Sequence, residues 1–193
     1  MMATGPLPIA VVTCVLALSA PAAGDEHLID LQKSTVTVRV YKSGFFSAFA
    51  DDHVIQAPLL EGSFDDTPHV QIVVDARRMK VLDPRASPKD RNDVQTRMLG
   101  PEVLDVNRFE QIRFHSVAIH RQDGGGWRVE GELELHGQIH PVDVNVALER
   151  GHYKGSTSLK QSTFGITPIS IVGGTVKVKD EVRVEFEIVA AEP

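Results

Sequence analysis

The chain has 193 residues, a formal net charge of −6, and 42% hydrophobic residues. Its basic residues form no long run, which argues against nucleic acid or an anionic lipid surface as the main partner. The only cysteine, Cys14, lies in an N-terminal apolar stretch, so the rest of the chain has no disulfide, thiolate metal site or cysteine nucleophile. A neutral, apolar or cationic small molecule stays open as a ligand.

The first 24 residues carry no charged side chain, and small residues from Ser19 to Gly24 follow an apolar run that begins at Pro8. This order is typical of a cleaved signal peptide, although the usual basic residue near Met1 is missing. The apolar run is shorter than the ~20 residues that a membrane-spanning helix needs. We therefore expect a signal peptide over residues 1–24 and one domain over 25–193, with a retained N-terminal anchor as the alternative. Export without disulfides favours the bacterial periplasm.

Alternation of apolar and polar residues predicts strands over 31–41, 54–64, 70–74 and 79–82. The second of these strands should bend at Pro58, because proline has no N–H to give to a sheet. A helix is expected to begin at Ser87-Pro88, to bury Val94 and Met98, and to end at Gly100-Pro101.

The second half of the chain reads as a series of hairpins. A strand over 111–120 changes phase at Ser116, which predicts a β-bulge, and the glycines 124–126 form the next hairpin loop. A hairpin over 129–148 turns at Gly137, a polar strand covers 152–162, and a loop over 165–174 leads to the last strand, 182–188. About eight antiparallel strands with one or two short helices can close into a barrel, and a two-sheet sandwich fits these short hairpins less well.

Several motifs occur in order along the expected domain. They are Ser34–Val38, Glu61–Phe64, Val103–Asp105 with Phe109 and Ile112–Ser116, the hairpin Gly131–Val142, and Ser158–Ile166 with Val182–Ile188. With these motifs the chain resembles the YceI-like family of exported polyisoprenoid-binding proteins over nearly all of the expected domain. The resemblance implies an all-β, eight-stranded antiparallel lipocalin-like β-barrel. It also implies an elongated apolar cavity for the isoprenoid chain of a quinone or polyprenyl lipid.

The apolar side chains of the expected strands all point to one side, where they either fill a solid core or line a cavity. A prenyl chain needs only dispersion contact and exclusion of water, and these positions supply no polar group. The residues expected to contact the lipid, including three phenylalanines between strands and one helical methionine, are Val36, Val38, Phe45, Phe46, Phe49, Phe64, Ile72, Met98, Ile112, Phe114, Leu133, Leu135, Val144, Val146 and Phe186.

Two segments are candidates for the mouth of the cavity. Phe45, Phe46 and Phe49 have the spacing of a short helical turn, which either plugs the barrel end or forms a lid over it. Arg91 and Arg97 lie on the predicted helix, where a cation could meet a phosphate or a quinone oxygen. The alternative for these arginines is an ordinary solvated helix face.

A metal site is the main rival hypothesis. Asp51 and His53 could share an ion with a third ligand, such as His69, His115 or His136, whereas an Asp that caps the backbone N–H groups of a turn is the simpler interpretation. No histidine pair has a metalloprotease spacing, and Ser158 and Ser162 lack a nucleophile elbow. His120 and His140 lie near strand ends and are expected to be exposed, and we expect neither a metal nor a cofactor.

The sequence thus predicts a non-enzymatic protein that carries or sequesters an isoprenoid lipid. A metal-dependent enzyme at the barrel mouth, using Asp51 and His53, is one alternative. An envelope stress or interaction module without a ligand is another. A homodimer and transient membrane contact for ligand exchange are compatible with the same sequence, and nucleic acid is not an expected partner.

Overall fold

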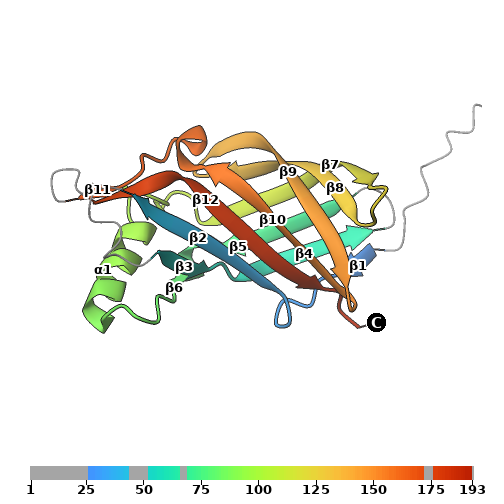
Figure 1. Ribbon diagram of the computed structural model, residues 1–193, viewed down its shortest axis with the longest axis horizontal. Coiled ribbons are helices and arrows are strands. Elements are labelled where there is room, and N and C mark those ends of the chain that lie inside the picture. Colours follow the sequence, from blue (N-terminus) through green and yellow to red (C-terminus); the bar gives the residue numbers. More distant parts are fainter. Residues whose placement is uncertain (1–25, 44–51, 66–68, 172–175, 193) are drawn as a thin grey trace, which may run out of the picture.

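The computed structural model describes residues 26–43, 52–65, 69–171 and 176–192 (Figure 1). Within these residues it has one α-helix, two 3-10 helices and twelve strands. The helices are α1 (Pro88–Leu99), η2 (Ala76–Arg78) and η3 (Gln161–Phe164). The strands are β1 (Glu26–Leu28), β2 (Thr35–Ser43), β3 (His53–Gln56), β4 (Leu59–Asp65), β5 (Val70–Asp75), β6 (Lys80–Val81), β7 (Gln111–Arg121), β8 (Trp127–Leu135), β9 (Gln138–Glu149), β10 (His152–Lys160), β11 (Ser170–Ile171) and β12 (Val176–Val189).

All strands belong to one antiparallel sheet, in the order β1-β4-β5-β7-β8-β9-β10-β12-β2-β3-β6, with β11 paired to β12. The predicted all-β class, the antiparallel pairing and the helix are confirmed. The predicted count of eight strands is not confirmed. β1 and β11 are too short to show a period-2 pattern, and one predicted strand is divided into β3 and β4. None of the helices in the described residues has the length and apolar character needed to cross a membrane.

The division between β3 and β4 lies at Ala57-Pro58, where the sequence predicted a bend. β3 pairs with β2, whereas β4 pairs with β5. The backbone N–H of Ala57 still donates to Val36 O over 2.9 Å, and Pro58 O accepts from the N–H of Asp75 over 3.1 Å. Because Pro58 has no N–H, this chain segment changes partner here, and the change curls the sheet.

The sheet also returns onto itself through the residues that follow β1. Ile29 forms an isolated bridge with Ala190, just after β12. The N–H of Asp30 donates to Val189 O and the N–H of Ala191 donates to Leu28 O, both over 2.8 Å. Since β1 and β12 lie far apart in the strand order, these bonds bring the two parts of the curled sheet together around an interior (Figure 1).

The bulge predicted in the strand over 111–120 is confirmed. The register of β7 against β8 shifts between Ser116 and Ala118. Val117 is the extra residue, and it is 64% exposed, whereas Ile119 returns to the inner face of the sheet. The bulge therefore lets β7 keep its apolar face inward along its whole length.

Helix α1 begins and ends as the sequence predicted. The Ser87 hydroxyl accepts a hydrogen bond from the N–H of Asp90 at the N-cap, and Gly100 follows the last helical residue. Gln95 attaches the helix to the sheet, because its amide accepts from the N–H of Val81 and donates to Met79 O, each over 2.8 Å. The helix thereby covers one end of the curled sheet (Figure 1).

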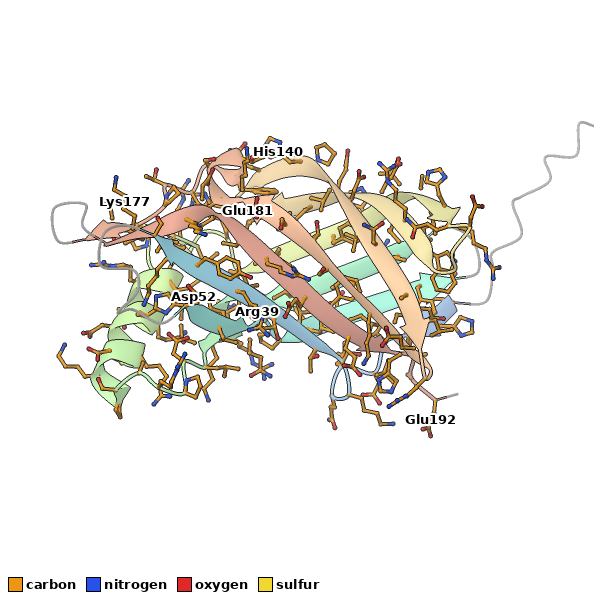
Figure 2. All side chains as sticks on the ribbon, viewed as in Figure 1. Arg39, Asp52, His140, Lys177, Glu181 and Glu192 are labelled. Carbon is orange, nitrogen blue, oxygen red and sulfur yellow. The ribbon has the colours of Figure 1, made fainter. Side chains whose placement is uncertain are left out.

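The outer face of the sheet is charged. Arg39, which Figure 2 labels, has its Nε 2.7 Å from Glu185 Oε2 on the neighbouring strand. Arg128 Nη2 lies 2.7 Å from Asp143 Oδ2. Such half-exposed pairs add little to the free energy of unfolding. They show that the polar positions of each strand face water, so that the apolar positions face the interior.

Candidate functional site

The curled sheet encloses a cavity with a volume of about 600 Å³. Of its 35 lining residues, 31 are hydrophobic, and the others are Asp65, Arg121, Thr157 and Gln161. A volume of this size is within the usual range of ligand pockets. The described side chains therefore leave a cavity, and the alternative of a solid core is wrong.

The residues predicted to contact a lipid can be located in this cavity. Twelve of the fifteen belong to the described residues, and all twelve line the cavity: Val36, Val38, Phe64, Ile72, Met98, Ile112, Phe114, Leu133, Leu135, Val144, Val146 and Phe186. Phe45, Phe46 and Phe49 lie outside the described residues. The cavity lining follows from the alternation of each strand, since residues two apart face the same side. Contact with a ligand stays a prediction.

Two glycines make room for aromatic rings on the inner face. Gly131 lies in β8, and a Cβ built there would stand 2.5 Å from the ring of Phe114. A Cβ built on Gly155 in β10 would likewise clash with the ring of Phe186, its neighbour on β12. Each ring therefore occupies the space that a side chain at the glycine would fill. No sequence pattern indicated a role for either glycine on this face.

Helix α1 and the segment after it close one end of the cavity, which we call the helix end. Met98, Leu104 and Ile166 line the cavity there, and their side chains are only 6%, 8% and 4% exposed. This end is therefore shielded from water by packed apolar side chains. The segment around Leu104 was part of a family motif, but the sequence alone did not place it at the cavity.

The opposite end, which we call the hairpin end, lies near the β7–β8 and β9–β10 loops and carries aromatic rings in a chain. The ring centroids of His27 and Phe64 are 5.5 Å apart, those of Phe64 and Tyr153 are 5.2 Å apart, and those of Tyr153 and Trp127 are 5.9 Å apart. β4, β8 and β10 supply the last three rings, so the chain runs across the interior. Phe64 was a predicted contact residue, but Trp127 and Tyr153 were missed, because their partners are distant in sequence.

Comparison with known proteins agrees with this geometry. The model of the YceI-like domain matches residues 28–190. The chain belongs to the YceI-like family.

Known relatives of this YceI-like chain have been found by sequence and by structure. A UPF0312 protein of Vibrio cholerae serotype O1 is 24% identical over 114 residues, and the match spans 59% of that protein's length and 54% of this chain. The crystal structure of Burkholderia cenocepacia BcnA is similar with a TM-score of 0.59 and 22% identity, over 85% of this chain and 99% of that one. A polyisoprenoid binding domain from Saccharophagus degradans, implicated in plant cell wall breakdown, has a TM-score of 0.58 and 12% identity, over 86% and 98%. These two structural likenesses show a shared fold.

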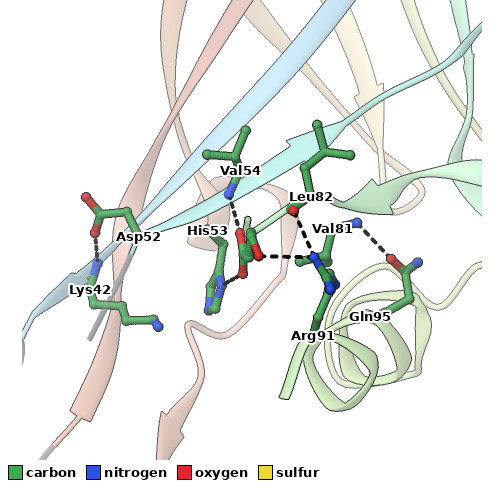
Figure 3. A network of polar contacts seen from close by, with 9 residues as sticks. Lys42, Asp52, His53, Val54, Val81, Leu82, Arg91 and Gln95 are labelled. Carbon is green, nitrogen blue, oxygen red and sulfur yellow. Dashed lines mark hydrogen bonds and ion pairs between the residues drawn. The ribbon is translucent and has the colours of Figure 1, made fainter. Parts of the chain in front are cut away.

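A polar network fixes the edge of the YceI-like sheet next to α1 (Figure 3). The buried carboxylate of Asp83 lies 2.5 Å from His53 Nδ1 and accepts a 2.8 Å hydrogen bond from the N–H of Val54. Arg91 on α1 donates to the carbonyl oxygens of Leu82 and Asp83 over 3.4 and 3.3 Å. Arg91 therefore binds the backbone of the segment that follows β6. These hydrogen bonds give no support to its predicted role in binding a ligand.

The residues of the metal hypothesis do not converge in the described part of the chain, where no group of three potential ligands is found. Asp51 lies outside the described residues, and the carboxylate beside His53 belongs to Asp83. Asp52 accepts a 3.0 Å hydrogen bond from the N–H of Lys42 in β2, and the turn between these two residues lies outside the described residues.

The other histidines have local partners. His69 contacts Gln71, and His115 lies 3.3 Å from Glu132 on the next strand. His120 is exposed as predicted, whereas His140 is half-buried, because its ring meets the edge of Phe164 with centroids 5.2 Å apart. His69, His115 and His140 thus each contact a neighbouring side chain of the sheet or of η3.

One buried carboxylate beside the cavity has a displaced pKa. Burial of Asp75, at the end of β5, raises its pKa, but hydrogen bonds and the positive charge of Arg77 outweigh burial and hold the pKa below its ordinary value. The carboxylate accepts from the N–H of Arg77 over 3.1 Å and from its Nε over 3.2 Å. Asp75 thus stabilises the turn of η2 as a charged group and takes no part in the cavity lining.

Proposed function

We propose that this protein is an exported lipid-binding protein that holds a long isoprenoid chain, as in a quinone or a polyprenyl lipid, for carriage or sequestration. The observation that carries the proposal is the apolar cavity of about 600 Å³ inside the curled sheet. Membership of the YceI-like family supports it, as does the similar fold of the polyisoprenoid binding domain from Saccharophagus degradans.

The chemistry of the cavity lining suits a branched hydrocarbon chain. Valine, isoleucine, leucine and phenylalanine dominate the wall, and they offer dispersion contacts without hydrogen-bond partners. Burial of apolar carbon contributes about 0.8 kcal/mol for each CH₂ group, so one fully buried five-carbon prenyl unit contributes about 4 kcal/mol before the cost of ordering the chain. A few buried units are therefore enough for tight binding without any specific polar contact.

The proposed export rests on the N-terminal sequence. Residues 1–24 have the composition of a signal peptide, and the domain that follows contains no cysteine. In the periplasm, a protein with an apolar cavity inside its curled sheet would carry a prenyl lipid across an aqueous space that the free lipid cannot cross. The mass of the N-terminal peptide of protein purified from a periplasmic fraction tests this part; an intact Met1 in the cytosolic fraction contradicts it.

The lipid itself can be tested on the native protein. We expect an organic extract of the purified full chain to contain an isoprenoid lipid in amounts close to one per protein molecule, identified by mass spectrometry. The control is an extract from Val144→Asp, which places a carboxylate at a buried position of the wall and should retain far less lipid. Absence of lipid, together with no saturable uptake of an added prenyl quinone, would refute the proposal.

A further inference from the structure

Three aromatic side chains at the hairpin end lie on the inner face of the sheet, close to the ends of their strands. Phe64 is the last residue but one of β4, Trp127 is the first of β8, and Tyr153 is the second of β10. All three line the cavity. We call these three side chains the aromatic barrier.

The aromatic barrier spans the interior and leaves no passage between neighbouring rings. Tyr153 meets Phe64 edge to face with centroids 5.2 Å apart, although β10 and β4 lie far apart in the strand order. The centroid of Tyr153 is also 5.9 Å from that of Trp127. Aromatic rings at such distances are in contact, so a hydrocarbon chain cannot pass between them without displacing a ring. Tyr153 is the ring that joins the other two.

The exposure of the inner-face residues changes at the barrier. Val144 and Val146 of β9 line the cavity, and Val144 is only 9% exposed. Leu148 is the next inner-face residue of this strand, but it is 50% exposed and does not belong to the cavity lining. Trp127 is the cross-strand partner of Val146, and Tyr153 is the partner of Leu148. The barrier therefore marks the boundary between the apolar interior and water.

Two charged residues border the cavity at the same end. Asp65 directly follows Phe64, and Arg121 is the cross-strand partner of Trp127. A hydrocarbon that extended past the barrier would meet these charges and water, and the part beyond the barrier would gain no burial. The helix end is closed by packed apolar side chains, so the distance between the two ends limits the length of a buried chain.

This distance can be estimated from β8, whose lining residues run from Trp127 to Leu135, next to the contact between His136 and η3 at the helix end. The nine residues of β8 make eight steps of about 3.4 Å, and a strand tilt of about 40° reduces their projection to about 20 Å. An extended covalent chain advances about 3.5 Å in three bonds, so the four-bond repeat of a prenyl unit is about 5 Å long. The cavity therefore holds about four prenyl units in line.

We infer that the aromatic barrier sets the length of the isoprenoid chain that the cavity accepts, with a limit of about four prenyl units. The inference rests on the proposed function. Each unit up to this limit is buried and tightens binding, whereas any further unit must displace the rings or stay in water. Phe64, Tyr153 and Trp127 thus determine the specificity for chain length.

The experiment offers delipidated full-length protein an equimolar mixture of prenyl hydrocarbons with two, four and six units. Mass spectrometry of an organic extract of the washed protein gives the ratio in which they are retained. Tyr153→Ala removes the joining ring, and Trp127→Leu removes a barrier ring from another strand. Tyr153→Phe keeps the ring, and Phe114→Ala removes a ring of similar size from the inner face away from the barrier, where Phe114 pairs with Leu133. Thermal unfolding checks that each variant is folded.

We expect the wild-type protein to retain the four-unit hydrocarbon at least about tenfold over the two-unit one, and the six-unit one no more strongly than the four-unit one. Tyr153→Ala and Trp127→Leu should each retain the six-unit hydrocarbon about tenfold over the four-unit one. Tyr153→Phe and Phe114→Ala should keep the wild-type ratio of six-unit to four-unit hydrocarbon.

Three results would refute the length limit while lipid binding stands. The first is a wild-type preference for six units over four as strong as that for four over two. The second is an unchanged ratio of six-unit to four-unit hydrocarbon in the barrier variants, and Trp127→Leu decides alone if Tyr153→Ala does not fold. The third is an equal rise of this ratio in Tyr153→Phe or Phe114→Ala. If the wild type retains none of the hydrocarbons, the proposed function itself fails.

Discussion

Gly131 offers a direct test of how the cavity wall is built. A Cβ added at this position would stand 2.5 Å from the carbonyl oxygen of His115 and 2.5 Å from two carbons of the Phe114 ring. Ordinary contacts between heavy atoms are about 3.5–4.0 Å. Gly131→Ala must therefore displace the Phe114 ring. The added Cβ cannot avoid the ring by moving toward His115 O, because this oxygen belongs to the backbone of the neighbouring strand β7.

The size of the effect can be estimated from two opposing contributions. Overpacking of a close-packed wall costs about 1–3 kcal/mol. Replacing glycine within a strand returns about 0.5–1 kcal/mol, because the unfolded chain loses conformational freedom. The net loss in the free energy of unfolding should be about 1–2 kcal/mol. For a domain of this size that loss lowers the melting temperature by roughly 2–8 °C.

The assay is thermal unfolding followed by circular dichroism, with Gly124→Ala as the matched control. Gly124 lies in the loop between β7 and β8, and a Cβ added there meets no atom within 4 Å. The control should therefore shift the free energy of unfolding by less than about 0.5 kcal/mol. If Gly131→Ala melts at the same temperature as the control, the ring of Phe114 does not lie on Gly131, and this account of the wall is wrong.

Three further predictions concern the sheet edge, acid stability and the cavity. Asp83→Ala removes the acceptor shared by His53 and the Val54 N–H, and it should cost about 1–3 kcal/mol and speed hydrogen exchange of the Val54 amide; unchanged exchange would contradict this role. Because the folded-state pKa of Asp75 is lowered, its contribution to the free energy of unfolding should be complete above about pH 4 and lost as the pH falls through the folded-state pKa. The melting temperature of Asp75→Asn, measured across this pH range, should lack that contribution. If the melting temperatures of the variant and the wild type fall equally as the pH is lowered, Asp75 makes no such contribution. Val38→Phe adds a ring to the cavity lining and should weaken binding of the four-unit prenyl hydrocarbon roughly tenfold, whereas Arg39→Gln, one residue on and facing water, should not; equal affinities would show that the chain does not pass Val38.

The part of the fold that the sequence predicted well is the part that depends on local patterns. The alternation in Val36 and Val38, or in Leu133 and Leu135, is enough to tell which residues face inward, because side chains of a strand point to opposite faces in turn. Pro58 and Ser116 likewise mark their bend and bulge through their own positions in the pattern. The eleven predicted contact residues that lie on described strands line the cavity for this reason, and Met98 reaches it from α1.

The features that escaped prediction depend on partners far apart in the sequence. His53 was considered with Asp51, its near neighbour, but the structure pairs it with Asp83, 30 residues away. The contact between Phe64 and Tyr153 crosses the interior, so no local pattern could indicate it. A pocket outside the cavity likewise joins the end of α1 to His136 and the loop after η3, which are far apart in the sequence.

The central claim is that the apolar cavity binds an isoprenoid chain. Trp127 makes this claim measurable, because it is the only tryptophan of the chain and lines the cavity. A prenyl quinone that enters the cavity should quench the fluorescence of Trp127. We predict saturable quenching of delipidated protein with one equivalent of quinone, and recovery when an excess of the prenyl hydrocarbon displaces it. Quenching that never saturates, or that the hydrocarbon does not reverse, would contradict the claim.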